Sequence, residues 1–173
     1  MKEAIDPGER ELLLLGLLRK REMHGYQLLD FLETHLGLFF DLKKATAYNL
    51  LGKMEEMGWV SSREEKEGRR PVRRVFAITA EGESVFQDLL RKALPDYRYP
   101  VFPANVPILF LDALSNQERA DLLKERRGEV GDRMDALELH MDHVAHPLLE
   151  HRRRILQAEL DWLAVLIEGA EKT

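Results

Sequence analysis

The first strong hydrophobic pattern in the chain is a run of six leucines between residues 12 and 18, interrupted only by Gly16. Asp6, Pro7 and Glu9 precede it at the spacing of a helix N-cap with a capping box, so we predict a helix from about residue 7. Because leucines lie around its whole circumference, this helix needs cover on two sides. A domain of this size is expected to cover one side, which leaves an apolar face for another element or another chain.

Two further helices are predicted before residue 58. Apolar residues recur at helical spacing between residues 23 and 32, which indicates an amphipathic helix. The next helix is expected from about residue 42 to residue 57, with Asp41 as its N-cap and Gly58 as its end. Its inward face is predicted to consist of Leu50, Leu51, Met54 and Met57.

Residues 59–65 and 72–79 are short extended runs joined by a loop with Gly68 and Pro71, which predicts a β-hairpin. A fourth helix follows and ends near Ala93. In a winged helix-turn-helix, which has this order of elements, the third helix enters the DNA major groove and the hairpin, or wing, reaches the flanking backbone or minor groove. We therefore predict a mainly α fold, with an N-terminal winged helix-turn-helix and a two-stranded β wing.

The second part of the chain has a different pattern. Four prolines and three aromatic residues between residues 95 and 107 predict a semi-rigid extended linker. Beyond it, a capping box at Ser115 opens a long helix to about residue 144, and a last helix is expected from about residue 148 to residue 168. The predicted domains are residues 1–94, the linker 95–107 and a helical dimerisation domain over residues 108–173.

Apolar residues of the last helix repeat every seven positions along more than one stripe. A seam this wide suggests association between helices of two subunits, and the uncovered face of the first helix offers a matching surface. We predict a homodimer whose interface contains Leu13, Leu14, Leu17, Leu149, Ile155, Leu156, Trp162, Leu163 and Leu166. The alternative is a helical hairpin that folds back on the first helix of its own chain.

The net charge of −5 lies entirely in the second part of the chain. Residues 1–94 contain 16 basic and 16 acidic side chains, whereas residues 95–173 contain 10 and 15. Six basic residues of the first part are concentrated around the hairpin loop, namely Arg63, Lys66, Arg69, Arg70, Arg73 and Arg74. A local positive surface of this kind meets DNA phosphates despite the acidic total, with dispersed solubilising charge as the alternative.

Side chains suited to DNA contacts lie on the predicted outward face of the third helix and on the wing. Asn49 is able to pair two hydrogen bonds with an adenine edge, lysines supply charge for phosphates, and arginines at a wing tip suit a narrow minor groove. The predicted DNA-binding residues are Lys43, Lys44, Thr46, Tyr48, Asn49, Lys53, Arg69, Arg70, Arg73 and Arg74. For any one of them a solvated surface is the alternative, and the prediction rests on their combination.

Several short motifs resemble a known family. They are Leu14-Leu15-Gly16-Leu17-Leu18, Met23-His24-Gly25-Tyr26-Gln27-Leu28, Thr46-Ala47-Tyr48 with Leu51, Met54 and Glu55, Gly58-Trp59-Val60, and Arg73-Arg74-Val75-Phe76-Ala77-Ile78-Thr79 with Gly82. Together they resemble the PadR-like transcriptional regulators over about residues 10–92. The family commonly has other residues where this chain has Lys43, Lys44, Asn49 and Gly52, so its target sequence is not transferable from relatives.

The resemblance implies a dimer in which the C-terminal region serves dimerisation and the last helix packs on the partner's first helix. It also implies small aromatic or amphiphilic compounds as effectors. Trp162, at the predicted dimer seam, is the candidate stacking surface for such a compound, and a plain core position is the alternative. The effector-binding residues are otherwise unknown from the sequence.

Other classes of site find little support. The chain has no cysteine, which removes disulfides and thiolate metal sites and is typical of a reducing cytoplasm. It has no run long enough to span a membrane, no signal-peptide pattern and no phosphate-loop or hydrolase motif, so we expect a cytoplasmic protein that is not an enzyme and needs no cofactor. His140, His143 and His146 have a spacing that suits a metal, but solvated or interface histidines are favoured and no metal site is predicted.

The sequence therefore predicts a transcriptional regulator, a homodimeric repressor that binds double-stranded DNA and is released by a small aromatic or amphiphilic effector. The alternative is a winged-helix module that binds proteins and not DNA. The zero net charge of residues 1–94 favours this alternative, whereas the concentration of basic residues at the wing favours DNA.

Overall fold

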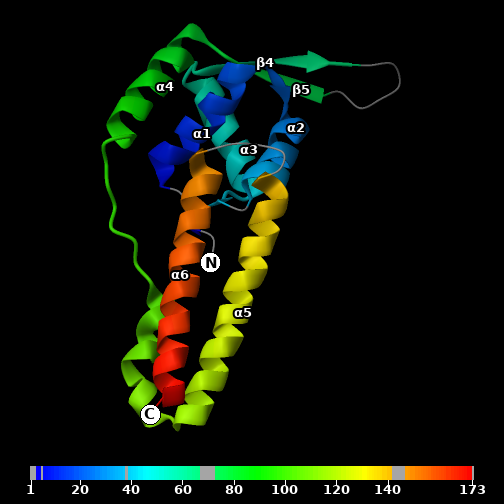
Figure 1. Ribbon diagram of the computed structural model, residues 1–173. Coiled ribbons are helices and arrows are strands. Elements are labelled where there is room, and N and C mark those ends of the chain that lie inside the picture. The colour runs from blue at the N-terminus through cyan, green and yellow to red at the C-terminus, as the bar shows by residue number, and fades with distance from the viewer. Residues whose placement is uncertain (1–2, 5, 38, 67–72, 142–146, 173) are drawn as a thin grey trace. The chain divides into compact units, whose positions relative to one another are not determined.

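The computed structural model describes residues 3–4, 6–37, 39–66, 73–141 and 147–172 (Figure 1). The chain divides into two compact units, Met1–Tyr99 and Pro100–Thr173. The described residues are mainly helical, with a small antiparallel sheet in the first unit, which confirms the predicted fold class. Within the described ranges, no helix combines the length and the apolar character that crossing a membrane requires.

The elements of the first unit follow the predicted order. Its helices are α1 (Pro7–Lys20), α2 (Gly25–Phe31), α3 (Lys44–Glu56) and α4 (Ala80–Ala93). Its strands are β1 (Glu3–Ala4), β2 (Met23–His24), β3 (Phe40–Asp41), β4 (Val60–Glu65) and β5 (Arg73–Ile78). A π-helical segment, η1 (Leu32–Leu36), continues α2 towards the turn before α3.

Helix α1 is covered from two sides within the first unit. Leu14, Leu15 and Leu18 are buried in a core shared with α2, α3, β4 and β5. Helix α4 also lies against α1 and packs its apolar residues on the same core. The expectation that the domain covers only one side was therefore wrong in part, because α4 supplies a second cover while Leu13 and Leu17 stay partly exposed.

The sheet has three strands in the order β2-β5-β4. Strand β4 pairs antiparallel with β5 and ends with Glu65 opposite Arg73. On the other edge of β5, Met23 of β2 lies opposite Phe76. The wing is thus joined by a third strand, and Met23 does not start the second helix as predicted. A strand of two residues shows no alternation of its own, and only its long-range pairing with β5 defines it.

Helix α3 starts later than predicted. Asp41 does not cap it, because Asp41 pairs with Ala4 in the short parallel pair of β3 and β1, and Lys43 holds the N-cap position. Ala47, Leu51 and Met54 form the buried face. Met57, which was expected to face inward, is 47% exposed because it follows the last helical residue.

A corner around Thr79 joins α3, the hairpin and α4. The Thr79 hydroxyl donates to the carbonyl oxygen of Gly58 at 2.6 Å and accepts the backbone N–H of Gly82 at 3.0 Å. A Cβ atom on Gly82 would lie only 1.9 Å from the carbonyl oxygen of Trp59, so no side chain fits there. Gly58 has φ of +75°, in the region that favours glycine. The corner therefore fixes the hairpin relative to the end of α3.

The second unit is a helical hairpin with one additional segment. Its elements are the 3-10 helix η2 (Pro103–Ala113), α5 (Asn116–Met141) and α6 (Pro147–Lys172). Helices α5 and α6 run side by side (Figure 1), with Leu123, Leu163 and Ile167 in their core. Segment η2 overlaps the last five residues of the predicted linker, from Pro103, whereas residues 96–102 have no regular secondary structure.

Candidate nucleic-acid interface

Helix α3 turns one face into the core and the opposite face to solvent. The three buried residues of the helix fix its rotation about its own axis. The structure then places Asn49 and Lys53 on the side away from the core, both exposed, with Thr46 partly buried beside them. Lys44 and Tyr48 are also exposed but lie nearer to α2. The exposed surface around Asn49 therefore comprises Asn49 and Lys53 with Thr46 beside them, and it is flanked by Lys44 towards η1 and Tyr48 towards α2.

Tyr48 contacts the start of α2. A Cβ atom on Gly25 would lie 3.0 Å from the hydroxyl oxygen of Tyr48 and 3.2 Å from the Cε2 atom of Phe76. The bare backbone of Gly25 thus allows α2, α3 and β5 to approach one another closely. Because Tyr48 remains 47% exposed, its ring contributes to this packing and still presents a surface to solvent.

Lys44 forms an ion pair within the first unit. Its Nζ lies 2.7 Å from Oε2 of Glu33, in η1. The hydrogen bond and the negative charge of Glu33 raise the pKa of Lys44 above its usual value. Both side chains are more than half exposed, so the pair lies at the surface. One of the predicted DNA-binding lysines therefore already has a carboxylate partner.

Arg74 is bound to α3 and β4. Its Nη2 donates to Glu55 of α3 at 2.5 Å and to the hydroxyl of Ser62 at 2.7 Å, and its guanidinium carbon lies 5.1 Å from the ring centroid of Phe76. Ser62 and Arg74 together hold the pKa of Glu55 below its ordinary value. These contacts link the wing to α3, so Arg74 contributes to the scaffold as well as to the positive charge of the wing.

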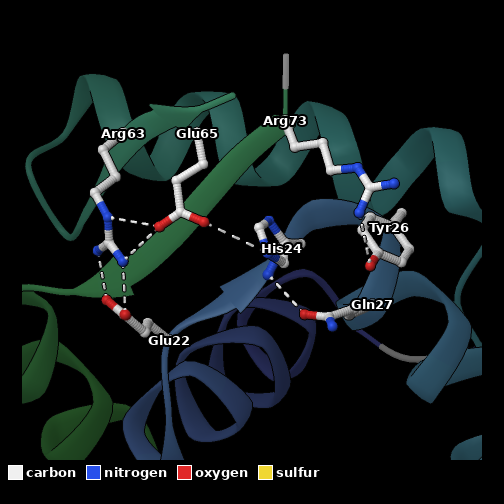
Figure 2. Close-up of polar contacts among 7 residues, drawn as sticks. All are labelled: Glu22, His24, Tyr26, Gln27, Arg63, Glu65 and Arg73. Carbon is white, nitrogen blue, oxygen red and sulfur yellow. Dashed lines mark hydrogen bonds and ion pairs between the residues drawn. The ribbon is translucent and has the colours of Figure 1, made fainter. Parts of the chain in front are cut away.

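Arg63 is held between two carboxylates at the root of the wing (Figure 2). Its Nη1 and Nη2 donate to both carboxylate oxygens of Glu22 at 2.5 and 2.6 Å, and Nη2 donates to Glu65 at 3.0 Å. The same contact with Arg63 lowers the pKa of Glu22. This pair fastens β4 to the segment between α1 and β2, and it compensates the charge of Arg63.

Arg73, His24 and Tyr26 lie together on the other side of this cluster (Figure 2). The guanidinium carbon of Arg73 is 5.0 Å from the Tyr26 ring centroid, and its Nη1 donates to the Tyr26 hydroxyl at 3.3 Å. The His24 ring stacks on Tyr26 with centroids 5.6 Å apart, and its Nε2 is 3.7 Å from Oε2 of Glu65. The backbone N–H of His24 donates to Gln27 at 3.2 Å. The start of α2 thus positions Arg73 at the wing.

One further basic residue of the wing, Lys66, is described. Lys66 is exposed at the end of β4. Arg69 and Arg70, which were predicted to contact the minor groove, lie outside the described residues. Their role stays a prediction from the sequence.

Sequence reasoning missed the acidic side of this surface. Glu22, Glu33 and Glu55 each form an ion pair with one of the basic residues singled out from the sequence. The partners are separated by 41 positions for Glu22 and by 19 for Glu55, and no local pattern joins them. The only signal was the equal number of acidic and basic residues in residues 1–94.

Four residues of the predicted dimer interface are buried within the chain. Leu14 is fully buried in the core of the first unit, and Leu149, Leu156 and Leu163 are buried in the hairpin of the second. All four leucines are therefore covered within the chain; the three of α6 form its first seven-residue stripe, and Leu163 packs on Leu123 of α5. A second stripe stays accessible: Ile155 is 39% exposed, and Trp162 and Leu166 are partly buried.

Trp162 packs beside Arg126 in the second unit. The guanidinium carbon of Arg126 lies 5.6 Å from the Trp162 ring centroid, and its Nη2 donates to Glu159 at 2.7 Å. Trp162 also packs against the core that Leu123 forms with α6. One side of the indole is therefore engaged within the chain. His143 and His146 lie outside the described residues, as does the side chain of His140.

Comparisons with known proteins give the same fold. Residues 14–88, less than half of the chain, match the family described as "Transcriptional regulator PadR-like family". The curated negative transcriptional regulator PadR of Bacillus subtilis (strain 168) is 28% identical over 113 residues, which cover 65% of this chain and 62% of that protein. The chain thus matches less than two thirds of the length of this relative.

Two crystal structures of Bacillus subtilis PadR are similar to this structure. The complex with operator DNA has a TM-score of 0.81 at 21% identity and covers 92% of this chain and 98% of that chain. The complex with p-coumaric acid has a TM-score of 0.79 at 21% identity and covers 96% and 98%. At this identity the likeness concerns the fold. The match over residues 14–88 shows that this part of the chain is similar to the PadR-like transcriptional regulators.

Proposed function

We propose that this protein binds double-stranded DNA in a sequence-selective manner and regulates transcription, most simply as a repressor. The observation that carries the proposal is the exposed surface of α3 around Asn49, which the buried face of the same helix and the corner at Thr79 hold in a fixed orientation. An amide and several lysines on one exposed helix match the hydrogen-bonding pattern of a major groove and its flanking phosphates. The Bacillus subtilis relative in complex with operator DNA supports the same use of the fold.

Two substitutions on α3 separate base recognition from phosphate contact. Duplexes are first selected from a random pool with the full-length protein, and the selected sequences are then bound to Asn49→Ala and Lys53→Ala. Asn49→Ala is expected to reorder the preferred sequences, because a bidentate base contact contributes roughly 1–3 kcal/mol of discrimination. Lys53→Ala should lower the affinity for all selected sequences by a similar factor. Recovery of no enriched sequence, or unchanged preference in Asn49→Ala, would contradict the proposal.

A winged-helix module that binds protein is the second candidate. The pairing of Lys44, Arg63 and Arg74 with carboxylates favours it, because these contacts reduce the positive charge that DNA would meet. Exposed ion pairs are weak, however, and Lys66, directly after β4, adds an exposed positive charge. We therefore place DNA binding first, and the absence of any DNA complex in the selection would favour the protein-binding alternative.

We further propose a homodimer that responds to a small aromatic or amphiphilic compound. The second stripe of α6 supports dimerisation, because Leu148 and Ile155 are more than a third exposed on a helix that already has an intramolecular partner. The Bacillus subtilis relative in complex with p-coumaric acid supports a phenolic effector. The chain has two tryptophans, so Trp59→Phe leaves Trp162 as the fluorescence reporter. Titration of this variant with hydroxycinnamic acids tests the proposal, and binding without a change in DNA affinity would contradict regulation.

A further inference from the structure

The ion pair between Glu33 and Lys44 differs from the other ion pairs of the candidate interface. Glu22 accepts two hydrogen bonds from Arg63, and Glu55 accepts one from Arg74 and one from Ser62, so both carboxylates fasten the wing to the rest of the unit. The contact of Lys44 with Glu33 is between two side chains that are 58% and 67% exposed. Its position on the surface makes it the pair that a DNA phosphate displaces most easily.

Lys44 lies where α3 begins, next to the exposed surface around Asn49. Glu33 lies in η1, which carries the chain from α2 into the turn before α3. A phosphate that approaches Lys44 therefore meets the Glu33 carboxylate at the same place. Attraction to the ammonium group and repulsion from the carboxylate oppose each other there, and both act over the few ångströms that separate the two groups.

We propose that Glu33 limits the DNA affinity of this protein by competing with a DNA phosphate for Lys44. The inference rests on the proposed function and adds an affinity-setting residue to it. The neutral side chain of a Glu33→Gln variant would leave Lys44 free to bind phosphate and would remove one negative charge from the interface. Glu33 acts through Lys44, so its effect should depend on the presence of that lysine.

The test is a set of variants of the full-length protein, bound to a fluorescent duplex that carries the selected sequence. Glu33→Gln is compared with Lys44→Gln and with the double variant. Asp88→Asn is the matched control, because it also removes one negative charge from an exposed ion pair, the one between Asp88 and Arg91. Asp88 lies on α4, which packs against α1 and is not part of the surface around Asn49. Affinity is measured at several salt concentrations, and thermal melting reports whether each variant is folded.

We expect Glu33→Gln to bind about 3–10-fold more tightly than the wild type near 0.1 M salt, with a salt dependence steeper by up to about 0.9 in log–log slope, the value for one more phosphate contact. Asp88→Asn is expected to give only the smaller gain in DNA affinity that follows from the change in net charge. In the Lys44→Gln background, Glu33→Gln should give no more than this smaller gain.

Two results would overturn the inference while leaving the proposed function intact. One is an equal effect of Glu33→Gln and Asp88→Asn, and the other is a gain from Glu33→Gln that persists in the Lys44→Gln background. If the wild type forms no salt-sensitive DNA complex, the proposed function fails and this inference fails with it. Should Glu33→Gln melt well below the wild type, Glu33→Ala, measured in the same way, decides between the same outcomes.

Discussion

At the scale of single residues, two glycines of the first unit have opposite roles. Gly82 lies against the Trp59 carbonyl, and an added Cβ atom would overlap that oxygen at 1.9 Å. Gly52 lies within α3, and an added Cβ atom would meet no other atom within 4 Å. The first glycine is required by packing, whereas the second reduces the helix propensity of α3 without a steric reason.

Substitution of each glycine by alanine tests this difference. Gly82→Ala is expected to destabilise the protein by about 2–3 kcal/mol or more, because the corner around Thr79 has to open to admit the side chain. Gly52→Ala is expected to stabilise it by roughly 0.5–1 kcal/mol. Denaturant unfolding measures both values, and a Gly82→Ala variant as stable as the wild type would contradict the geometry of the corner.

Glu55 should make the stability of the fold depend on pH, and the direction of this dependence follows from its pKa. Hydrogen bonds from Ser62 and Arg74 lower its pKa in the folded protein below the ordinary value of 4.5. A carboxylate with a lowered pKa stabilises the fold above its unfolded pKa, and this contribution is lost as the pH falls through 4.5 towards the folded value. The stabilisation is therefore present at neutral pH and absent in acid.

The variant Glu55→Gln is expected to be less stable than the wild type by about 1 kcal/mol at pH 7 and to approach it near pH 3. Glu56→Gln, at the next and exposed position of α3, is the control for the change in net charge. Urea unfolding at a series of pH values measures the difference. A difference between wild type and Glu55→Gln that is constant over this range would show that the ionised contact does not stabilise the fold.

At the scale of elements, local patterns were sufficient for the helices and the hairpin. The leucine run of α1, the apolar spacing of α3 and the basic loop between two extended segments each show a periodicity within one segment. Strand β2, segment η2 and the start of α3 at Lys44 were not predictable, because each depends on contacts with segments distant in the sequence. The outward face of α3 was predictable because its residues lie within one short segment of the sequence. The carboxylates that pair with the basic surface were missed because they lie far from their partners in the sequence.

Segment η2 is attached to the hairpin of the second unit through Ile108, which packs on its core, and through Arg126. Its guanidinium donates to the carbonyl oxygen of Ala104 at 3.0 Å, to Asn105 at 2.6 Å and to Glu159 at 2.7 Å. One side chain of α5 thus joins η2 and α6. Arg126→Ala is expected to speed hydrogen exchange of the η2 amides severalfold, while Arg127→Ala, at an exposed position of the same helix, should not. Equal exchange in the two variants would argue against this role of Arg126.

At the scale of the whole molecule, the two stripes of α6 differ in how deeply they are buried. Leu149, Leu156 and Leu163 lie on one stripe and pack within the hairpin. Leu148, Ile155 and Trp162 lie on the neighbouring stripe and are less buried, and Ile155 and Trp162 belong to the predicted dimer interface. The seven-residue repeat of the sequence is therefore compatible with packing inside the hairpin and with the proposed dimer, and the repeat alone does not distinguish them.

Ile155→Glu tests the proposed dimer. A charge on the second stripe should convert a dimer of about 40 kDa, twice the chain mass of 20.1 kDa, into a monomer at micromolar concentration, as measured by sedimentation equilibrium. Ala164→Glu places the same charge on the opposite side of α6, at another exposed position, and should leave the dimer intact. A wild-type protein that sediments as a monomer would exclude the proposed dimer.

The central claim is that the surface of α3 and the wing binds DNA although the chain is acidic. The most direct measurement is the salt dependence of binding to a fluorescent duplex from the protein's own upstream region, compared with a scrambled duplex of equal length. We predict a tighter complex with the native duplex and a log–log slope of about −5 or steeper, as expected for about six phosphate contacts. Equal affinity for both duplexes, or a complex insensitive to salt, would contradict the account.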